Sequence, residues 1–181
     1  PSRRPTEIRS PALLVLYYDT DGISTLGARY GGVERDGYRN YGANAKIGID
    51  LSEEVSLDLR GWYADGYWHD DDVDFLMDNA ASLKSRQWVG YAGLNVVLFD
   101  GRFHNRVAFS YTDASKHSES TWGSLAFAGR NARLEYQGSY DIGQGTQLSF
   151  GAEHEKQEAD AFDPSASAPS AKIDSLYALL I

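Results

Sequence analysis

The amino-acid sequence predicts an all-β fold, an antiparallel up-and-down meander of about eight strands. Three observations lead to this prediction: apolar and polar residues alternate with period two, tight turns alternate with long polar connections, and the better strands are about ten residues long. Ten strand residues tilted by about 40° rise roughly 25 Å, the height of the apolar band of a bilayer-spanning barrel. The predicted fold is therefore part of a transmembrane outer-membrane β-barrel.

Alternation is clearest at 41–50, where an apolar or small side chain occupies every second position. Such alternation indicates strands that present one apolar face and one polar face. Further strands are expected, in chain order, at about 12–18, 55–60, 87–98, 103–112, 132–141, 147–153 and 171–181.

The connections fall into two classes. Tight turns that are polar or contain glycine are expected at 51–54, 99–102 and 141–145. Long polar connections are expected at about 19–37, 69–85, 114–130 and 158–170. In a meander this order places every tight turn at one end of the sheet and every long connection at the other, as in outer-membrane barrels.

The alternation also assigns side chains to the two faces. We expect a lipid-side face that includes Ile47, Leu57, Phe109, Leu134 and Phe150. The lumen face is expected to include Lys46, Arg60, Arg106, Arg133 and Glu135. Aromatic residues near strand ends are candidates for interfacial girdles: Tyr38, Tyr41, Tyr63, Tyr67, Trp68, Trp88, Tyr111 and Tyr140.

Composition excludes several classes of protein. The 181 residues are 42% hydrophobic and carry a formal net charge of -9. This negative charge and the absence of a Lys/Arg cluster argue against a nucleic-acid partner. The absence of cysteine excludes disulfides, thiolate metal sites and a cysteine nucleophile. The longest apolar run, from Ala12 to Leu16, is far shorter than the roughly 20 residues of a membrane helix.

We divide the chain into an unassigned N-terminal segment, 1–12, and a partial barrel domain, 13–181. The sequence begins without a methionine or a signal-peptide pattern, and it stops within an apolar alternating run at Ile181. We therefore expect a piece of a longer chain, truncated at both ends.

One acidic stretch has enough carboxylates to bind a hard cation such as calcium, at Asp70, Asp71, Asp72 and Asp74. It lacks the glycine and glutamate spacing of an EF-hand, so a solvated loop without a cofactor is the favoured reading. The four histidines are scattered, and no catalytic constellation, nucleophile elbow or phosphate loop is found. We therefore do not expect an enzyme.

Several short segments resemble the early barrel of TonB-dependent receptors similar to vitamin B12 transporters. They are Tyr17-Tyr18-Asp19-Thr20-Asp21-Gly22-Ile23-Ser24, Glu34-Arg35-Asp36-Gly37-Tyr38-Arg39-Asn40, Leu134-Glu135-Tyr136-Gln137-Gly138 and Phe150-Gly151-Ala152-Glu153-His154-Glu155. Their order and spacing carry the resemblance, which covers about residues 17–181.

The resemblance implies an integral barrel of about 22 strands with a plugged lumen. It implies location in the outer membrane of a Gram-negative bacterium, with the lipid bilayer, the TonB complex and a plug domain as partners. The ligand would be cobalamin or an iron-siderophore-type chelate. No TonB box or plug is recognised in this chain, and its strands are too few to close such a barrel, so no ligand-contact residue is assigned.

Two alternatives remain at this stage. A small self-contained outer-membrane barrel of eight strands, structural or adhesive in role, fits the strand number. A soluble carbohydrate-binding β domain fits the abundance of Tyr and Trp.

Overall fold

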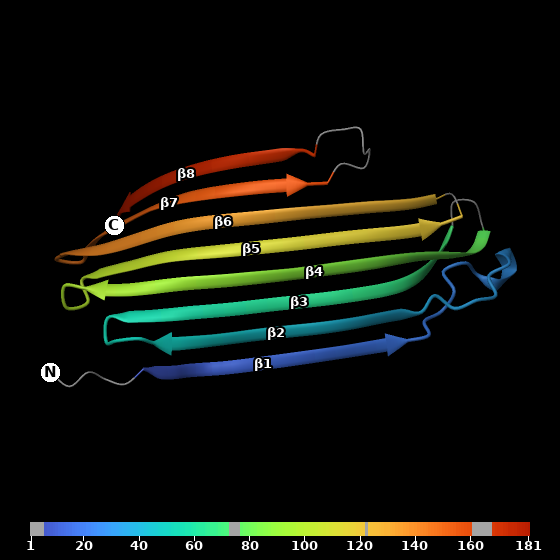
Figure 1. The fold of residues 1–181 in the computed structure, drawn as a ribbon, viewed down its shortest axis with the longest axis horizontal. Helices are drawn as coiled ribbons and strands as arrows, with labels where there is room; N and C mark the ends of the chain where they lie inside the picture. The colour runs from blue at the N-terminus through green and yellow to red at the C-terminus, as the bar shows by residue number, and fades with distance from the viewer. Residues whose placement is uncertain (1–5, 73–76, 122, 161–167) are drawn as a thin grey trace.

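The chain forms a single eight-stranded antiparallel sheet in the computed structural model, which describes residues 6–72, 77–121, 123–160 and 168–181. Strands adjacent in sequence are adjacent in the sheet, from β1 to β8 (Figure 1). The predicted meander is therefore confirmed. The elements are β1 (Glu7–Thr20), the short 3-10 turn η1 (Ala28–Tyr30), β2 (Tyr38–Asp50), β3 (Val55–Asp72), β4 (Met77–Leu98), β5 (Phe103–Ser120), β6 (Gly123–Gly143), β7 (Thr146–Ala159) and β8 (Ser170–Leu180).

The three tight turns lie at one end of the sheet, where they join β2 to β3, β4 to β5 and β6 to β7 (Figure 1). Asp100 and Gly101 have φ of 54° and 89°, the left-handed region in which Asp and Gly are favoured. The turn before β3 is closed by Ser52, whose hydroxyl accepts hydrogen bonds from the amides of Glu54 and Val55 at 3.2 and 3.1 Å. The predicted turn positions are therefore confirmed.

Two of the predicted long connections are largely strand. The connections expected at 69–85 and 114–130 were placed too widely, because β3 continues to Asp72 and β5 continues to Ser120. Pairing persists through polar positions such as Lys116, which lies opposite Phe127. Backbone ladders need no apolar side chains, so the pairing outlasts the alternation that revealed the strands. Likewise β1 begins at Glu7, within the segment left unassigned.

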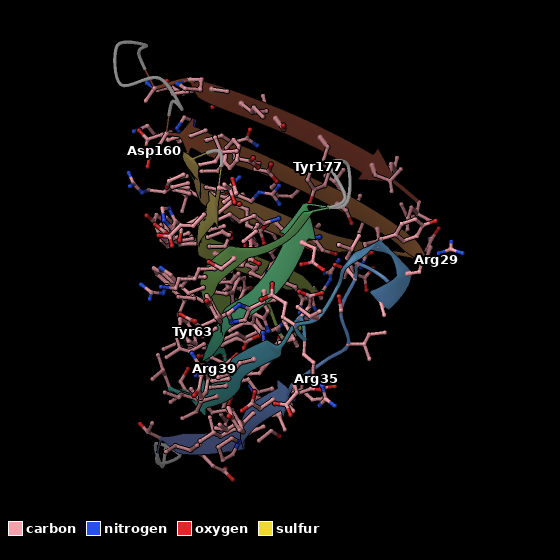
Figure 2. The ribbon with its side chains drawn as sticks, turned by 90° about the vertical axis from the view of Figure 1, so that its right-hand side faces the viewer. Arg29, Arg35, Arg39, Tyr63, Asp160 and Tyr177 are labelled. Atoms are coloured by element: carbon pink, nitrogen blue, oxygen red, sulfur yellow. The ribbon has the colours of Figure 1, made fainter. Side chains whose placement is uncertain are left out.

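The register separates the side chains into two faces. Ile47 lies opposite Leu59, while their neighbours Lys46 and Arg60 lie opposite each other on the other face. Seen from the end, the sheet is curved, and Tyr63 projects from its convex side (Figure 2). Following the register, Ile47, Leu57, Phe109, Leu134 and Phe150 share the convex face with Tyr63, and Lys46, Arg60, Arg106, Arg133 and Glu135 share the concave face. The predicted division into two faces is confirmed.

Glycines allow aromatic rings to lie flat across neighbouring strands. A Cβ at Gly138 would lie 2.6 Å from the ring of Phe150, and one at Gly151 would lie 2.5 Å from the ring of Tyr177. No enclosed core forms in the described residues, where Leu26 and Ala108 are the buried apolar residues. Many apolar side chains of the sheet, including Ile47, Leu57, Phe109 and Leu134, instead face outward from its convex side.

Candidate functional site

The convex face carries an apolar band across β1 to β6, and on β7 and β8 the row of Leu134 ends in His154 and Asp174, which contact each other at 2.6 Å. Leu57 lies opposite Leu94, and Phe109 lies opposite Leu134. The last two side chains are 47% and 52% exposed, although both belong to interior strands of the sheet. A contiguous exposed apolar surface of this kind marks contact with a membrane or a protein partner.

A row of aromatic side chains borders the band on the side of the long connections. Tyr17 packs against Tyr41 with ring centroids 4.9 Å apart, and Trp88 packs against Tyr111 at 5.1 Å. Tyr63 joins the row because it lies directly opposite Trp88. Tyr and Trp concentrate at the two interfaces of membrane barrels, where an apolar ring body meets a polar tip and water.

A second aromatic group borders the band near the tight turns. Phe103 lies 5.8 Å from Tyr140 and 6.3 Å from Phe150, measured between ring centroids. Within β5, the distance from Phe103 to Tyr111 is about 26 Å along the strand, or roughly 20 Å along the membrane normal at a tilt of about 40°. The two aromatic groups are therefore separated by about the thickness of a barrel's apolar belt.

Two of the predicted girdle residues lie on the wrong face. Tyr38 and Trp68 lie opposite each other on the concave face, where Tyr38 also packs against Tyr18 with ring centroids 5.8 Å apart. They were misassigned because proximity to a strand end was counted without the parity of the position. Tyr41, three residues beyond Tyr38, necessarily points to the opposite face.

Charged pairs follow the first aromatic row on the convex face. Arg86 on β4 contacts Asp65 at 3.0 Å, and Asp65 also accepts a hydrogen bond from the hydroxyl of Tyr63 at 3.1 Å. On the next hairpin, Arg130 contacts Asp113 at 3.4 Å. The change from apolar to paired charges within two residues of the aromatic row is the change expected where a bilayer gives way to water.

The concave face is polar and hydrogen-bonded from strand to strand. Glu155 is 5% exposed and accepts hydrogen bonds from Asn131 at 2.8 Å and from Arg133 at 3.0 and 2.8 Å. Arg106 contacts Glu135 at 3.0 Å in the same region. Such a face suits a wetted or protein-filled interior and would be costly against hydrocarbon.

The acidic stretch at the end of β3 is only partly the site that was predicted. Asp71 is 6% exposed, and its Oδ2 accepts hydrogen bonds from Ser24, Thr25 and the amide of Leu26 at 3.3, 3.1 and 3.0 Å. The Oδ1 of Asp70 accepts the amide of Asp71 at 3.0 Å. Asp74 and the side chain of Asp72 lie outside the described residues.

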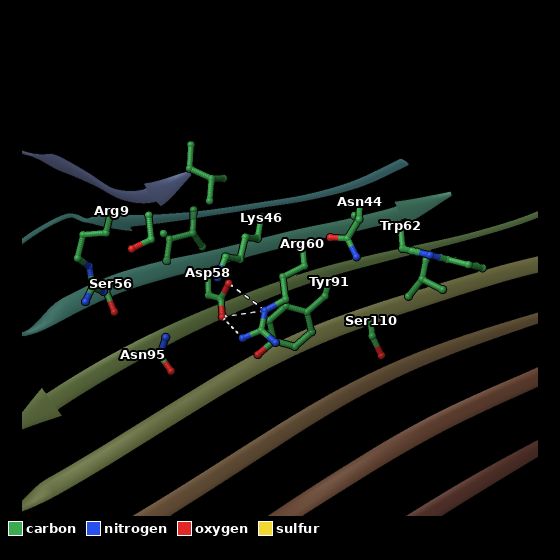
Figure 3. Close-up of a pocket in the computed structure, with 16 residues that line it drawn as sticks. Arg9, Asn44, Lys46, Ser56, Asp58, Arg60, Trp62, Tyr91, Asn95 and Ser110 are labelled. Carbon is green, nitrogen blue, oxygen red and sulfur yellow. Dashed lines mark hydrogen bonds and ion pairs between the residues drawn. The ribbon is translucent and has the colours of Figure 1, made fainter. Parts of the chain in front are cut away.

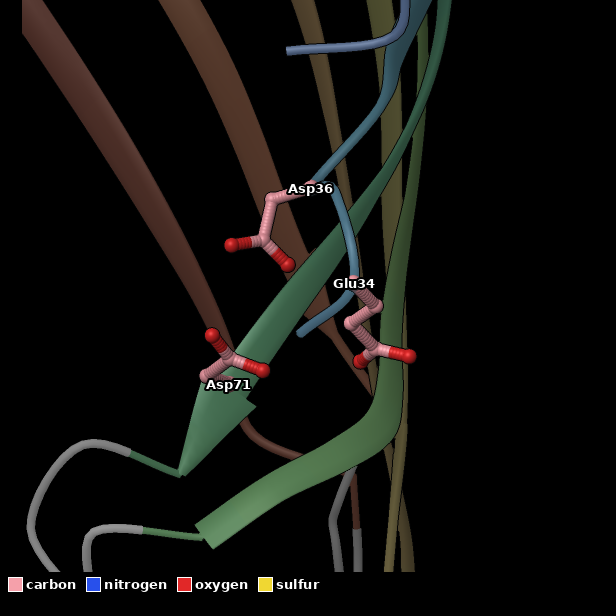
Figure 4. A group of neighbouring side chains, drawn as sticks. All are labelled: Glu34, Asp36 and Asp71. Atoms are coloured by element: carbon pink, nitrogen blue, oxygen red, sulfur yellow. The ribbon is translucent and has the colours of Figure 1, made fainter. Parts of the chain in front are cut away.

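The connection between β1 and β2 supplies the partners that the sequence did not reveal. One carboxylate oxygen each from Glu34, Asp36 and Asp71 lies within 4.8 Å of the others (Figure 4). Oδ1 of Asp36 and Oδ1 of Asp71 are buried and have no hydrogen-bond partner among the described residues. Oxygens this close can share one calcium ion, whose ligands lie about 2.3–2.6 Å from the metal. In the sequence, the only sign of this group was the pair of carboxylates at Glu34 and Asp36, separated by one residue.

His117 lies near a carboxylate and a serine, the residue types of a catalytic triad. His117 contacts Glu119 at 3.0 Å and Ser124 at 3.5 Å, and both contacts use Nε2. A relay from a serine through histidine to a carboxylate needs the two ring nitrogens separately, so this group cannot act as a triad. No helix in the described part of the chain is long and apolar enough to cross a membrane.

The comparisons with known proteins agree with this geometry. The chain is similar to the crystal structure of the siderophore receptor PiuA from Acinetobacter baumannii, with a TM-score of 0.51 and 15% sequence identity. The eight-stranded sheet has the fold of part of that receptor. The match covers 97% of this chain and 37% of the receptor chain. The sequence matches no protein-family model and no curated protein.

Proposed function

We propose that this chain is a wall segment of an outer-membrane β-barrel that belongs to a TonB-dependent receptor, with its convex face against lipid. The observation that carries the proposal is the exposed apolar band between two aromatic groups, opposite a polar concave face. The fold similarity to a siderophore receptor supports it. In this role the protein transports a ligand and catalyses no reaction.

The partners of the proposal follow from the same arrangement. In the described residues β1 and β8 are the two edges of the sheet and do not pair with each other. Lipid cannot form hydrogen bonds with the backbone groups of an open sheet edge. The two open edges therefore favour a larger barrel, closed by further strands, over a self-contained barrel of eight strands. A plug domain within the lumen, the TonB complex and a Gram-negative outer membrane belong to this proposal. The exposed convex band argues against a soluble carbohydrate-binding domain.

The ligand class of the proposal is a small iron chelate or cobalamin. The similar structure is that of a siderophore receptor, which favours the iron chelate. The experiment for the wall segment itself is liposome flotation of the refolded chain. We expect the chain to float with the liposomes and to resist alkaline extraction.

The flotation experiment has a matched pair of variants. Replacing Ile47, Leu57 and Phe109 together by Asp places three charges on the convex face and should abolish flotation. A control variant places Asp on the concave face of the same strands, at Asn44, Ser56 and Ser110, and should still float. Equal flotation of both variants, or a wild-type chain that stays in the aqueous fraction, would contradict the proposal.

A second proposal concerns the long-connection end, where we propose that calcium binds Glu34, Asp36 and Asp71. Three carboxylates within 4.8 Å repel one another, and the buried Oδ1 atoms lack donors among the described residues. A bound divalent cation supplies the missing charge and ties the connection after β1 to the end of β3.

Limited trypsin digestion tests the calcium proposal, because Arg29 and Arg35 lie in the tied connection and are exposed. Calcium should slow cleavage there relative to a chelator, and Asp71→Asn should remove this protection. Glu119→Gln removes an exposed carboxylate elsewhere and should leave the protection intact. Cleavage that is insensitive to calcium in the wild-type chain would refute the site.

A further inference from the structure

A hollow lies on the concave side of the sheet, across β1 to β5, with a volume of about 720 Å³ (Figure 3). This volume lies within the range of about 300–1,000 Å³ that is usual for small-molecule sites. The side chains of Arg9, Lys46, Asp58 and Arg60 line it. Three cations thus face one carboxylate.

The single carboxylate is already occupied. Both oxygens of Asp58 accept hydrogen bonds from Nε of Arg60, at 3.2 and 3.1 Å. Arg9 contacts Asp50, outside the hollow, at 2.8 Å. No ion pair joins Lys46 to any described residue, but its charge interacts with Asp58, so Lys46 and Arg60 share the single carboxylate of the hollow.

The placement of Lys46 is unfavourable unless something compensates it. Lys46 and Arg60 lie directly opposite each other on the concave face. Directly opposed like charges destabilise a sheet, because their Cβ atoms are only about 4.5–5.5 Å apart. Arg9 lies opposite Gly48, two residues along from Lys46, so the three cations follow a diagonal across three strands. A ligand anion between them would relieve this repulsion.

The remaining polar groups of the hollow can both donate and accept hydrogen bonds. The amides of Asn44 and Asn95 and the hydroxyl of Ser110 point into it, from β2, β4 and β5 (Figure 3). The guanidinium of Arg60 lies 5.2 Å from the ring centroid of Tyr91, a cation–π contact that holds it in place. An acceptor-rich anion would pair with the three cations and with the N–H and O–H groups, while a cationic ligand would be repelled by the three cations and an apolar ligand would leave the polar groups unpaired.

We propose that this hollow binds a small polycarboxylate anion, with Lys46 and Arg60 as its charged contacts. Carboxylates form strong, often bidentate, hydrogen bonds with guanidinium groups. Cations spread over three strands suit several carboxylates on one molecule better than one tetrahedral phosphate. The inference rests on the proposed function only in taking the concave face as the interior wall of the barrel.

The test is titration of the refolded chain, in an uncharged detergent, with citrate, followed by the emission of Trp62, which also lines the hollow. We expect saturable binding that Lys46→Gln and Arg60→Gln each weaken at least about tenfold. Lys116→Gln makes the same charge change at an exposed position outside the hollow and should leave binding unchanged. Triethyl citrate, the uncharged ester, should not bind.

Three results would overturn the proposal. They are the absence of saturable citrate binding, an equal loss of binding in Lys116→Gln, and tighter competitive binding by inorganic phosphate or a hexaglutamate peptide, which would assign the hollow to another occupant. Flotation with liposomes, measured on the same preparation, distinguishes the two proposals. A chain that floats with liposomes but does not bind citrate would refute the anion site and leave the wall-segment proposal standing.

Discussion

At the scale of single residues, side chains close together on one strand lie in opposite environments, one apolar and one polar. Ile47 and Asn44 lie on the same strand but on opposite faces, by the parity of their positions. A charged substitution on the concave face, toward a wet interior, should change the free energy of unfolding little. The same substitution on the convex face, toward hydrocarbon, should lower it. The two faces can therefore be distinguished by one kind of substitution.

We predict that Ile47→Arg lowers the free energy of unfolding in lipid by about 2–4 kcal/mol, the cost of an arginine near the bilayer midplane of a barrel. Gln87→Arg, at a concave position outside the cationic hollow, should change it by less than about 1 kcal/mol, because the concave face is polar. Urea unfolding of the membrane-inserted protein measures both. Equal costs at the two positions would contradict the assignment of the faces.

We also predict that Glu155→Gln destabilises the concave network more than Glu119→Gln does, since it weakens charge-assisted bonds from Arg133 and Asn131 to Glu155. Arg133 is itself 43% exposed and keeps a contact to Glu153 at 3.4 Å, which limits the loss. Glu119→Gln, at an exposed position, should cost no more than about 0.5 kcal/mol. The same unfolding measurement decides whether the two costs differ.

At the scale of elements, the edge strand β1 differs from the interior strands. It is apolar on both faces: Leu13 and Val15 are 73% and 70% exposed on one, and Leu14 and Leu16 are 66% and 56% exposed on the other. Interior strands such as β6 have a polar concave face. An exposed, apolar strand edge is a template for pairing with another strand.

We predict that the isolated chain associates through this edge in detergent, and that Leu14→Lys together with Leu16→Lys reduces the association. Analytical ultracentrifugation in density-matched detergent measures the oligomeric state. A double lysine variant at Gln87 and Ser139, on the concave face of interior strands, is the control. If both variants dissociate alike, or the wild-type chain is monomeric, the edge is not the contact.

The elements also show how far sequence reasoning reached. Period-two alternation located five of the strands, and less regular runs located those near 12–18, 87–98 and 171–181. The tight turns at 51–54, 99–102 and 141–145 indicated the order of the meander. The ends of the strands that extend beyond the apolar band were missed. Ser, Lys and Asp at alternate positions there give no hydrophobic signal, while the backbone pairing continues. The extent of β3 and β5 was therefore underestimated.

The acidic group at the long-connection end shows a different limit. Asp71 was predicted with its sequence neighbours, but the structure places it against Glu34 and Asp36, more than thirty residues earlier in the chain. Spacing within a segment cannot reveal a partner that the topology brings in from the adjacent hairpin. The two faces, by contrast, depend on parity alone and were predicted correctly at every interior strand tested, from Lys46 to Phe150.

At the scale of the whole molecule, the open sheet limits what this chain can do alone. Its eight strands leave two unpaired edges, and a barrel closed at eight strands has an interior filled by side chains. We predict that the isolated chain in liposomes takes up neither a labelled iron chelate nor labelled cobalamin. Reproducible, saturable uptake would show that the chain is a complete transporter.

In the proposed wall segment, lipid covers the convex face and leaves the concave face free of lipid. Trp88 lies on the convex face and Trp62 on the concave face, and the two side chains are similarly exposed, at 42% and 39%. Two variants, each keeping one of these tryptophans and replacing the other three by Phe, give each face its own fluorescent reporter.

The most direct measurement is quenching of these two reporters in liposomes whose acyl chains are brominated near the headgroup. The emission of Trp88 should be strongly quenched by the brominated lipid, because it belongs to the aromatic row at the membrane interface. The emission of Trp62 should respond little to the lipid and more to an aqueous quencher. Equal quenching of both residues by lipid, or stronger quenching of Trp62, would contradict the account.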